Sequence, residues 1–481
     1  MRLNKIKNLL FLFFIFIVTA NAQEPVAGKA WSMEQCIDYA LKNNISVKQS
    51  ELNTEISEVN LKQSKANLLP ELNGSASHLY DFGLNIDRVT NELTKQEMLS
   101  ENLALNTDVN LFSGWQNINN IKQNRYNYQA GKFDIDKMKN DISLNVASDY
   151  LQILYNIESL ENAKNQMGIT AAQVDRTQKL VDAGAAAKGT LLDIQAQLAT
   201  EELNVTNAQN NLDISYLTLA QLLNMSSAEG FTIVKPEINI AGDALLTSNP
   251  TQIYNSAVAN LPEMKSADLK VKSAERGVSS AWGALSPRLS LVASYGTSYS
   301  SLPSQLSSLP AFEGYAPNGS YTSRGDTVLS PLFSNPTFKK ASFMDQYKDN
   351  ANKYFGFNLT VPIFNRFQTK LAIDKAKIQK INAELTVEST KLQIQKNIQQ
   401  AFADASAALK NYASSQKALI AMEESFKYTE QKFNVGMVNT TDYNTAKNKL
   451  ITSQSQVLQA KYQFVFKTKV LDFYQGKPLK F

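Results

Sequence analysis

The sequence predicts a mainly α-helical protein with a membrane β-barrel portion, in which one helix-strand-strand-long helix-helix repeat occurs twice. Two long stretches place apolar residues at the heptad spacing of coiled coils, which predicts helices of unusual length. Short segments between them alternate apolar and polar residues, which predicts strands. The order of segments in the first half recurs in the second half at constant spacing, so the two halves form one duplicated fold.

The N-terminus has the pattern of a secretory signal peptide. Three basic residues precede an apolar run from Leu9 to Val18, and small residues at positions 20 and 22 form a signal-peptidase site. We therefore expect residues 1–22 to be cleaved before Gln23, because the apolar run is too short to span a bilayer comfortably as a retained anchor. The only cysteine, Cys36, lies well beyond this site, so we expect no lipidation and a buried thiol.

The charge balance is close to neutral once the signal is removed. The 48 basic residues include three in the signal, which leaves 45 against 44 acidic residues. This balance lacks the electrostatic footprint of a nucleic-acid-binding protein. Outside the signal there is no apolar run long enough for a transmembrane helix, so any membrane-spanning part must consist of strands.

The first predicted repeat occupies residues 23–225. Its second helix ends at Pro70, which cannot continue a helix. In its second strand Leu103, Leu105 and Val109 alternate with polar residues, so one face suits lipid and the other suits water. In order, the expected elements are helices at 33–42 and 46–68, strands at about 71–81 and 103–112, and a long helical hairpin at about 115–224.

The second predicted repeat occupies residues 251–475, after a connector at 226–250 that is rich in glycine and proline. Pro287 follows Pro70 by 217 residues, whereas Phe364 follows Phe112 by 252 residues. The extra 35 residues therefore fall between the two strands, as an enlarged loop at 298–353. The expected elements are strands at about 288–298 and 355–364, a helical hairpin at about 365–474, and a tail at 476–481.

The long helices carry two apolar stripes. The stretch from Asn365 to Phe433 contains no proline or glycine, and as one helix it would be about 100 Å long. Every seventh residue is apolar at Leu371, Ile378, Leu385 and Leu392. A second stripe, at Ala405, Tyr412, Leu419, Phe426 and Phe433, lies 252 residues after Ile153, Leu160, Met167, Val174 and Val181. We expect neighbouring hairpins to cover these stripes.

The predicted strands and helices both need further copies of the chain. Four amphipathic strands cannot close a membrane barrel, since the smallest such barrels use eight, and lipid does not tolerate an open sheet edge. We therefore expect a ring-shaped homo-oligomer, in which a strand barrel continues into a helical cylinder. Such a tube is wide enough to conduct when its strands number about a dozen.

Paired motifs in the two repeats resemble the TolC-type outer-membrane efflux family over essentially the whole mature chain. They are ANLLPELNGSASHLY and GALSPRLSLVASYG before the first strands, VNLFSGW and VPIFNRF after the second strands, and VDAGAAAKGTLLDIQAQL and FNVGMVNTTDYNTAKNKL at the hairpin tips. The resemblance implies a homotrimer with a 12-stranded barrel in the outer membrane of a Gram-negative bacterium and an α-helical tunnel across the periplasm. It also implies docking onto a periplasmic adaptor (membrane fusion protein) that is driven by an inner-membrane transporter.

The resemblance places a pore constriction at the hairpin tips. In the family, carboxylates six and nine residues after the second-repeat glycine can line the narrowest point. Here those positions are Asp442 and Thr445, and the first-repeat equivalents are Thr190 and Asp193. Six carboxylates in a trimer would favour cations. The alternative is that Asp442 and Asp193 only stabilise the first turn of a helix.

The resemblance and the residue types suggest two further groups of site residues. We expect adaptor contact at the tip turns, which consist of Ala183, Gly184 and Ala185 in the first repeat and Val435, Gly436 and Met437 in the second. We expect aromatics at the membrane interface, at Phe112, Trp115, Phe364 and Phe367. Turn geometry alone and ordinary packing are the respective alternatives.

The sequence disfavours catalysis and leaves the cargo open. His78 is the only histidine, and there is no glycine-rich phosphate loop, so we expect no enzyme, no metal site and no cofactor. The expected function is an outer-membrane exit duct that conducts substrates passively. A type I protein secretion duct and a metal-ion efflux duct remain open, as does a coiled-coil structural or adhesive surface protein, although an adhesive stalk does not need amphipathic strands.

Overall fold

A computed structural model describes residues 30–86, 93–95, 97–236, 249–302, 305–477 and 479. The predicted signal peptide at 1–22 and part of the predicted connector, at 237–248, lie outside these residues. The chain divides into two compact units, and each unit combines segments of both sequence repeats. Unit 1 comprises Met1–Glu51, Asp134–Met264 and Lys391–Phe481, and unit 2 comprises Leu52–Phe133 and Lys265–Thr390.

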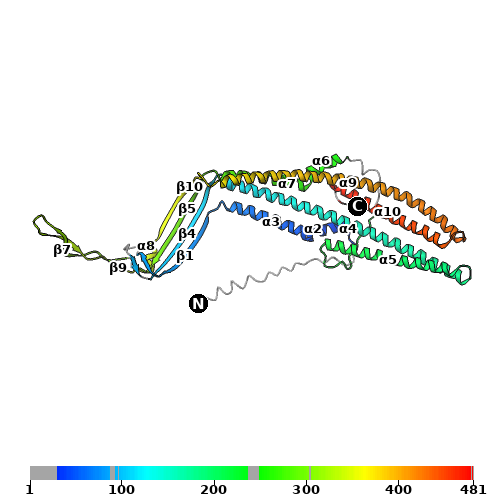
Figure 1. The fold of residues 1–481 in the computed structure, drawn as a ribbon, viewed down its shortest axis with the longest axis horizontal. Coiled ribbons are helices and arrows are strands. Elements are labelled where there is room, and N and C mark those ends of the chain that lie inside the picture. The colour runs from blue at the N-terminus through cyan, green and yellow to red at the C-terminus, as the bar shows by residue number, and fades with distance from the viewer. Residues whose placement is uncertain are drawn as a thin grey trace. The chain divides into compact units, whose positions relative to one another are not determined.

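Two helices of equal length run through both units (Figure 1). They are α4 (Gln116–Asp182) and α9 (Gln368–Asn434), and each has 67 residues. The continuous heptad pattern without proline accounts for their length, as the sequence predicted. Unit 1 also contains α2 (Met33–Asn43), α5 (Lys188–Leu222), α6 (Pro250–Asn260) and α10 (Thr440–Tyr474), whereas α3 (Ile45–Ala66) and α7 (Pro262–Gly283) belong mostly to unit 2.

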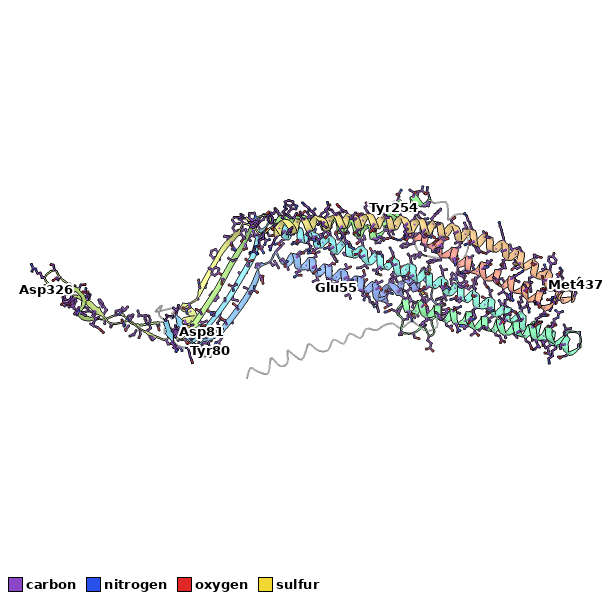
Figure 2. The ribbon with its side chains drawn as sticks, viewed as in Figure 1. Glu55, Tyr80, Asp81, Tyr254, Asp326 and Met437 are labelled. Carbon is purple, nitrogen blue, oxygen red and sulfur yellow. The ribbon has the colours of Figure 1, made fainter. Side chains whose placement is uncertain are left out.

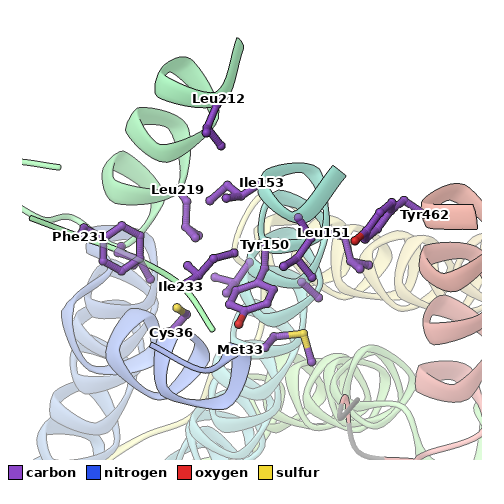
Figure 3. Packing of buried hydrophobic residues seen from close by; sticks show 14 of the residues in the cluster. Met33, Cys36, Tyr150, Leu151, Ile153, Leu212, Leu219, Phe231, Ile233 and Tyr462 are labelled. Atoms are coloured by element: carbon purple, nitrogen blue, oxygen red, sulfur yellow. The ribbon is translucent and has the colours of Figure 1, made fainter. Parts of the chain in front are cut away.

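A hydrophobic core lies in unit 1 (Figure 3), where α4 packs against α2, α5 and the segment after α5. Tyr150, Ile153 and Leu154 are almost completely buried, and burying each such side chain is worth about 1.5–3 kcal/mol. The Tyr150 hydroxyl donates a hydrogen bond to the carbonyl oxygen of Val234, at 2.6 Å. The predicted burial of Cys36 in this region is confirmed.

Unit 2 contains a four-stranded antiparallel sheet in the order β1-β4-β5-β10. Its strands are β1 (Glu71–Asp81), β4 (Met98–Ser113), β5 (Arg288–Ser300) and β10 (Asn352–Thr360). The prediction that the last strand reaches Phe364 was wrong. The strand ends at Thr360 because Pro362 has no N–H to donate to a ladder, and α9 accordingly begins at Gln368 rather than at Asn365.

Residues that pair across the strands of the first repeat have equivalents that pair across the strands of the second repeat. Gly74 faces Leu105 across β1 and β4, and the residues 217 and 252 positions later, Leu291 and Phe357, face each other across β5 and β10. Side chains on alternate positions share a face. One face is therefore mostly apolar, with Leu72, Ala76, Leu103, Leu105, Val109, Leu289, Leu291, Tyr295, Phe355, Phe357 and Leu359. The other face carries Asn73, Ser75, Ser77, Asn102, Asn106, Ser290, Ser294 and Asn358.

The segments between the paired strands contain further short elements. The first contains β2 (Leu84–Ile86) and β3 (Leu93–Lys95). The enlarged segment of the second repeat contains β6 (Gln305–Ser308), β7 (Phe312–Tyr321), β8 (Thr327–Phe333), β9 (Thr337–Lys339) and α8 (Phe343–Asp349). β7 pairs with β8 as an antiparallel hairpin, and Figure 2 labels Asp326 near its turn.

Candidate functional site

The two helical hairpins turn through the same backbone motif. The turn glycines, Gly184 and Gly436, have φ angles of 70° and 76°, a left-handed conformation that glycine adopts without strain. Ala185 N–H donates to the carbonyl oxygen of Leu180 at 2.7 Å, and Met437 N–H donates to that of Lys432 at 2.8 Å. These bonds, with those from the glycine N–H groups, satisfy the last carbonyls of α4 and α9 as in a Schellman motif.

The expected adaptor-contacting residues lie on these turns and are exposed. Met437, labelled in Figure 2, is 74% exposed, and Val435 is 70% exposed. Ala183 and Ala185 are also exposed, but they present only a methyl group each. The second-repeat turn is therefore the more apolar of the two.

The expected constriction residues occupy different positions relative to their helix ends. Asp442 lies in the first turn of α10, where its N–H donates to the side chain of the capping residue Asn439 at 2.8 Å. Asp193 is the sixth residue of α5, which has no acidic residue in its first turn. Stabilisation of a helix N-terminus therefore explains Asp442 but not Asp193.

The four constriction residues are not joined within one chain. Asp193, Asp442 and Thr445 are exposed, and Thr190 is half-buried. Across the described ranges, no hydrogen bond links the side chains of Asp193 and Asp442. Both carboxylates are thus available to face a space outside the chain.

A buried polar cluster that the sequence reasoning missed lies between α4, α5 and α10. Lys447 Nζ lies 3.2 Å from Glu201 Oε1, and Thr170 hydrogen-bonds with both side chains. Gln197 Nε2 also donates to Glu201 Oε1, at 3.1 Å. Burial lowers the pKa of Lys447, and the nearby carboxylates Glu201 and Glu430 partly oppose this effect.

Aromatic packing accompanies this cluster. The ring of Tyr443 stacks on that of Phe433, with 4.5 Å between centroids, and it also contacts Phe426. Burial raises the pKa of Tyr443 to about 12. These contacts attach the start of α10 to the last turns of α9, so the end of this hairpin is well packed within one chain.

The expected interface aromatics form two equivalent pairs at the junctions between strand and helix. Phe112 and Trp115 meet edge to face with centroids 6.1 Å apart, and Phe364 and Phe367 do so at 5.5 Å. Trp115 and Phe367 both have a positive φ, of 63° and 59°. This conformation is uncommon for an aromatic residue, and its recurrence 252 residues later marks a shared junction geometry.

Two features are absent from the described part of the chain. No group of three or more histidine, cysteine or acidic residues is arranged to hold a metal ion there. None of the helices in the described ranges is both long enough and apolar enough to cross a membrane.

Comparisons with known proteins agree with this architecture. A family model described as "Outer membrane efflux protein" matches residues 36–225 and 253–474. The outer membrane protein TolC of Escherichia coli (strain K12) is 21% identical over 445 residues, which cover 91% of this chain and 80% of TolC. The Campylobacter jejuni CmeC outer membrane channel aligns with a TM-score of 0.73 at 17% identity, over 92% of this chain and 85% of CmeC.

A second solved structure, the outer membrane protein VceC of Vibrio cholerae, aligns with a TM-score of 0.71 at 14% identity, over 93% of this chain and 97% of VceC. The duplicated fold of long helical hairpins and four strands is that of outer-membrane efflux channels, which are not enzymes. This chain belongs to the outer membrane efflux protein family, the TolC family, and it is an outer-membrane channel.

Proposed function

We propose that three copies of this chain form the outer-membrane exit duct of a tripartite export system. The duct conducts substrates passively from a periplasmic adaptor and an inner-membrane transporter to the exterior. The observation that carries the proposal is the open sheet: among the described residues, β1 and β10 each pair on one side only. Lipid does not tolerate such edges, so the strands of several copies must join, and three copies of a four-stranded sheet supply twelve strands.

The pairing of β4 with β5 suggests which residues of β10 in one copy would face which residues of β1 in the next copy. β4 and β5 join the second strand of one repeat to the first strand of the other, and β10 of one copy would meet β1 of the next in the same way. Ser294 donates to Asn106 across β4 and β5, at 2.7 Å. The equivalent residues are Asn358 in β10 and Ser77 in β1, so the same pair of residue types would face each other between copies.

The helices also support assembly. The stripe at Leu371, Ile378, Leu385 and Leu392 is 62–66% exposed in the single chain. An exposed apolar stripe with heptad spacing is stabilised when another helix covers it. Helices of neighbouring copies are the proposed cover.

The hairpin tips form the proposed entrance. Asp442 and Asp193 from three chains would line it with six carboxylates, beside Thr445 and Thr190, and would favour cations. The exposed turn residues that contact the adaptor are Ala183, Gly184, Ala185, Val435, Gly436 and Met437. Val435 and Met437 supply most of the apolar area. The proposed membrane-interface aromatics are Phe112, Trp115, Phe364 and Phe367.

Disulfide cross-linking tests the assembly directly. The variant N358C/S77C, in a C36A background, places two thiols at positions that face each other only between copies. Opposed Cα atoms in an antiparallel ladder lie about 4.5–5.5 Å apart, which a disulfide can bridge. After mild oxidation in membranes, we expect covalent dimers and trimers on a non-reducing denaturing gel, and channels in planar bilayers.

The matched control is N358C/N73C, whose second thiol lies on the same face of β1 four residues away. It should not cross-link. Equal cross-linking in both variants, or none in either, would overturn the proposed ring of paired edge strands.

A further inference from the structure

The short helix α8 completes one edge of the sheet. β5 continues to Ser300, but its pairing with β10 ends at Gly296. Gln346 of α8 takes over there, because its side chain donates to the carbonyl oxygen of Ser300 at 2.8 Å and accepts from the N–H of Ser300 at 2.9 Å. Asn350 Nδ2 also donates to the carbonyl oxygen of Ser298, at 2.8 Å. The helix is therefore fixed to backbone groups.

Further hydrogen bonds hold α8 over the mostly apolar face. Thr297 Oγ1 donates to the carbonyl oxygen of Tyr347 at 2.7 Å, and the Tyr347 hydroxyl donates to Glu101 Oε2 at 2.9 Å. Glu101 Oε1 in turn lies 2.7 Å from His78 Nδ1. Both oxygens of the Glu101 carboxylate are thus engaged, and Tyr347 is held in place.

A groove of about 650 Å³ runs between α8 and this face of the sheet. Its floor is open because Gly74, Ser75 and Ala76 of β1 have small side chains. Leu103, Leu105 and Tyr295 supply apolar lining, and Tyr347 and Lys348 of α8 also line the groove. The volume and the apolar lining suit a flexible hydrocarbon chain.

The second repeat carries larger side chains at the positions equivalent to the groove floor. Gly74 faces Leu105, and a Cβ at Gly74 would lie 3.3 Å from a terminal carbon of Leu105. The corresponding positions carry Leu291 and Phe357, which face each other with larger side chains. The strand pairing is the same in both repeats, so the space of this groove depends on the small residues of β1 together with α8.

Two lysines near this groove favour a ligand with negative charge. Lys348 lines the groove, and Lys353 Nζ lies 5.5 Å from the centroid of the Tyr295 ring on the same face. Within the described ranges neither ammonium has an ion-pair partner. A ligand with an apolar chain and an anionic headgroup would match the walls and these charges together.

We propose that this groove binds one lipid of the surrounding membrane, with an acyl chain along Gly74 and Ala76 and a phosphate headgroup at Lys348 and Lys353. The proposal rests on the proposed function in one respect, since the apolar face must lie in the bilayer. The bound lipid would fill the space that Leu291 and Phe357 occupy in the second repeat.

The test is native mass spectrometry of the full chain in detergent, with added phosphatidylglycerol or phosphatidylcholine as probes. We expect the unsubstituted protein to retain about one phosphatidylglycerol per chain and to prefer it over phosphatidylcholine. The variant K348Q/K353Q should weaken phosphatidylglycerol binding about tenfold, the effect of losing a charge-assisted contact, and should remove the preference. The variant G74L/L105F, which recreates the second-repeat pair, should retain neither lipid.

The control variant is A293L, which enlarges a side chain on the same face, at the second-repeat equivalent of Ala76, outside the groove lining. It should bind as the unsubstituted protein does. Equal retention of both lipids, or binding that K348Q/K353Q and G74L/L105F leave unchanged, would overturn the lipid site. Lipid is counted per chain, so this result is independent of whether the N358C/S77C variant cross-links, and the two proposals can fail separately.

Discussion

Lys447 Nζ lies 3.2 Å from Glu201 Oε1, and each of these side chains is only 3% exposed. The pair joins α10 to α5, and Thr170 links both to α4. A buried ion pair makes a fold little more stable than two apolar residues of similar size would. Removal of one partner is costly, however, because the other charge stays buried without a counter-charge. The three helices are therefore joined by a contact that is sensitive to single substitutions.

The variant K447M should lower the free energy of unfolding by about 3–5 kcal/mol, because Glu201 would remain buried without a counter-charge. K447M/E201M should recover most of that loss. Thermal or denaturant unfolding in detergent, followed by circular dichroism, measures both effects. The control is K179M, which removes an ion pair between exposed side chains, Lys179 and Asp175, and should cost no more than about 0.5 kcal/mol. If the losses of unfolding free energy from K447M and from E201M alone added up to the loss from K447M/E201M, the coupling between the two residues would be contradicted.

The same lysine predicts a pH dependence. Burial lowers the pKa of Lys447 from its usual value of 10.5, so between the folded and unfolded pKa values the unfolded chain binds more protons. The contribution of this group to stability should therefore increase as pH rises through that interval towards 10.5. Unfolding curves at several pH values should show a shallower increase for K447M than for the unsubstituted protein. If stability increased with pH equally in K447M and in the unsubstituted protein, Lys447 would not be the source of the pH dependence.

Cys36 should be unreactive in the folded protein. Its thiol is fully buried, and burial raises its pKa to about 12, so almost no thiolate exists at pH 8. We expect a water-soluble thiol reagent to label one thiol per chain after unfolding and none before. The single variant N358C, with an exposed additional thiol, is the positive control. Rapid labelling of Cys36 in the native state would show that the core around α2 opens readily.

Gly114 and Gly283 should not tolerate a side chain. A Cβ on Gly114 would lie 2.1 Å from the carbonyl oxygen of Gly283, and its φ angle is +62°. G114A should therefore prevent correct folding of the junction between β4 and α4, measured as loss of the folded protein in membranes. The matched control is G168A in α4, where a Cβ meets no atom within 4 Å. It should raise stability by about 0.5–1 kcal/mol, because alanine is the better helix former.

The sequence predicted the elements that depend on periodicity. The structure adds the strand register, in which Gly74–Leu105 and Leu291–Phe357 are related by the offsets of 217 and 252. Boundaries were less predictable. α5 begins at Lys188 and includes Gly189, because glycine at a helix start costs little when the following residues pack. Residues 298–353 were expected to form an enlarged loop, but the segment contains β6, β7, β8, β9 and α8.

The buried cluster was detectable but missed. Lys447 continues the buried spacing of α10, where Thr440, Tyr443 and Leu450 are also buried, and Glu201 lies seven residues after Ile194 in the buried stripe of α5. When two helices each carry a residue of opposite charge within a row of buried positions, the two residues are candidates for a buried ion pair. The contact itself follows only from the packing of α5 against α10, which the sequence alone does not determine.

The last prediction concerns the two carboxylates of the proposed entrance. If Asp442 and Asp193 line a narrow mouth, D442A/D193A should increase single-channel conductance in planar bilayers and weaken cation preference, because a ring of negative charge is removed and the side chains are shorter. T445A/T190A is the matched control, since it shortens side chains at the other two constriction positions without changing charge, and it should leave cation preference unaltered.

D442N/D193N separates the two causes: a loss of selectivity with little change in conductance would assign selectivity to charge and conductance to size. An anion-selective pore, or one indifferent to all three variants, would place the constriction elsewhere. Asp442 would then be explained by its position in the first turn of α10.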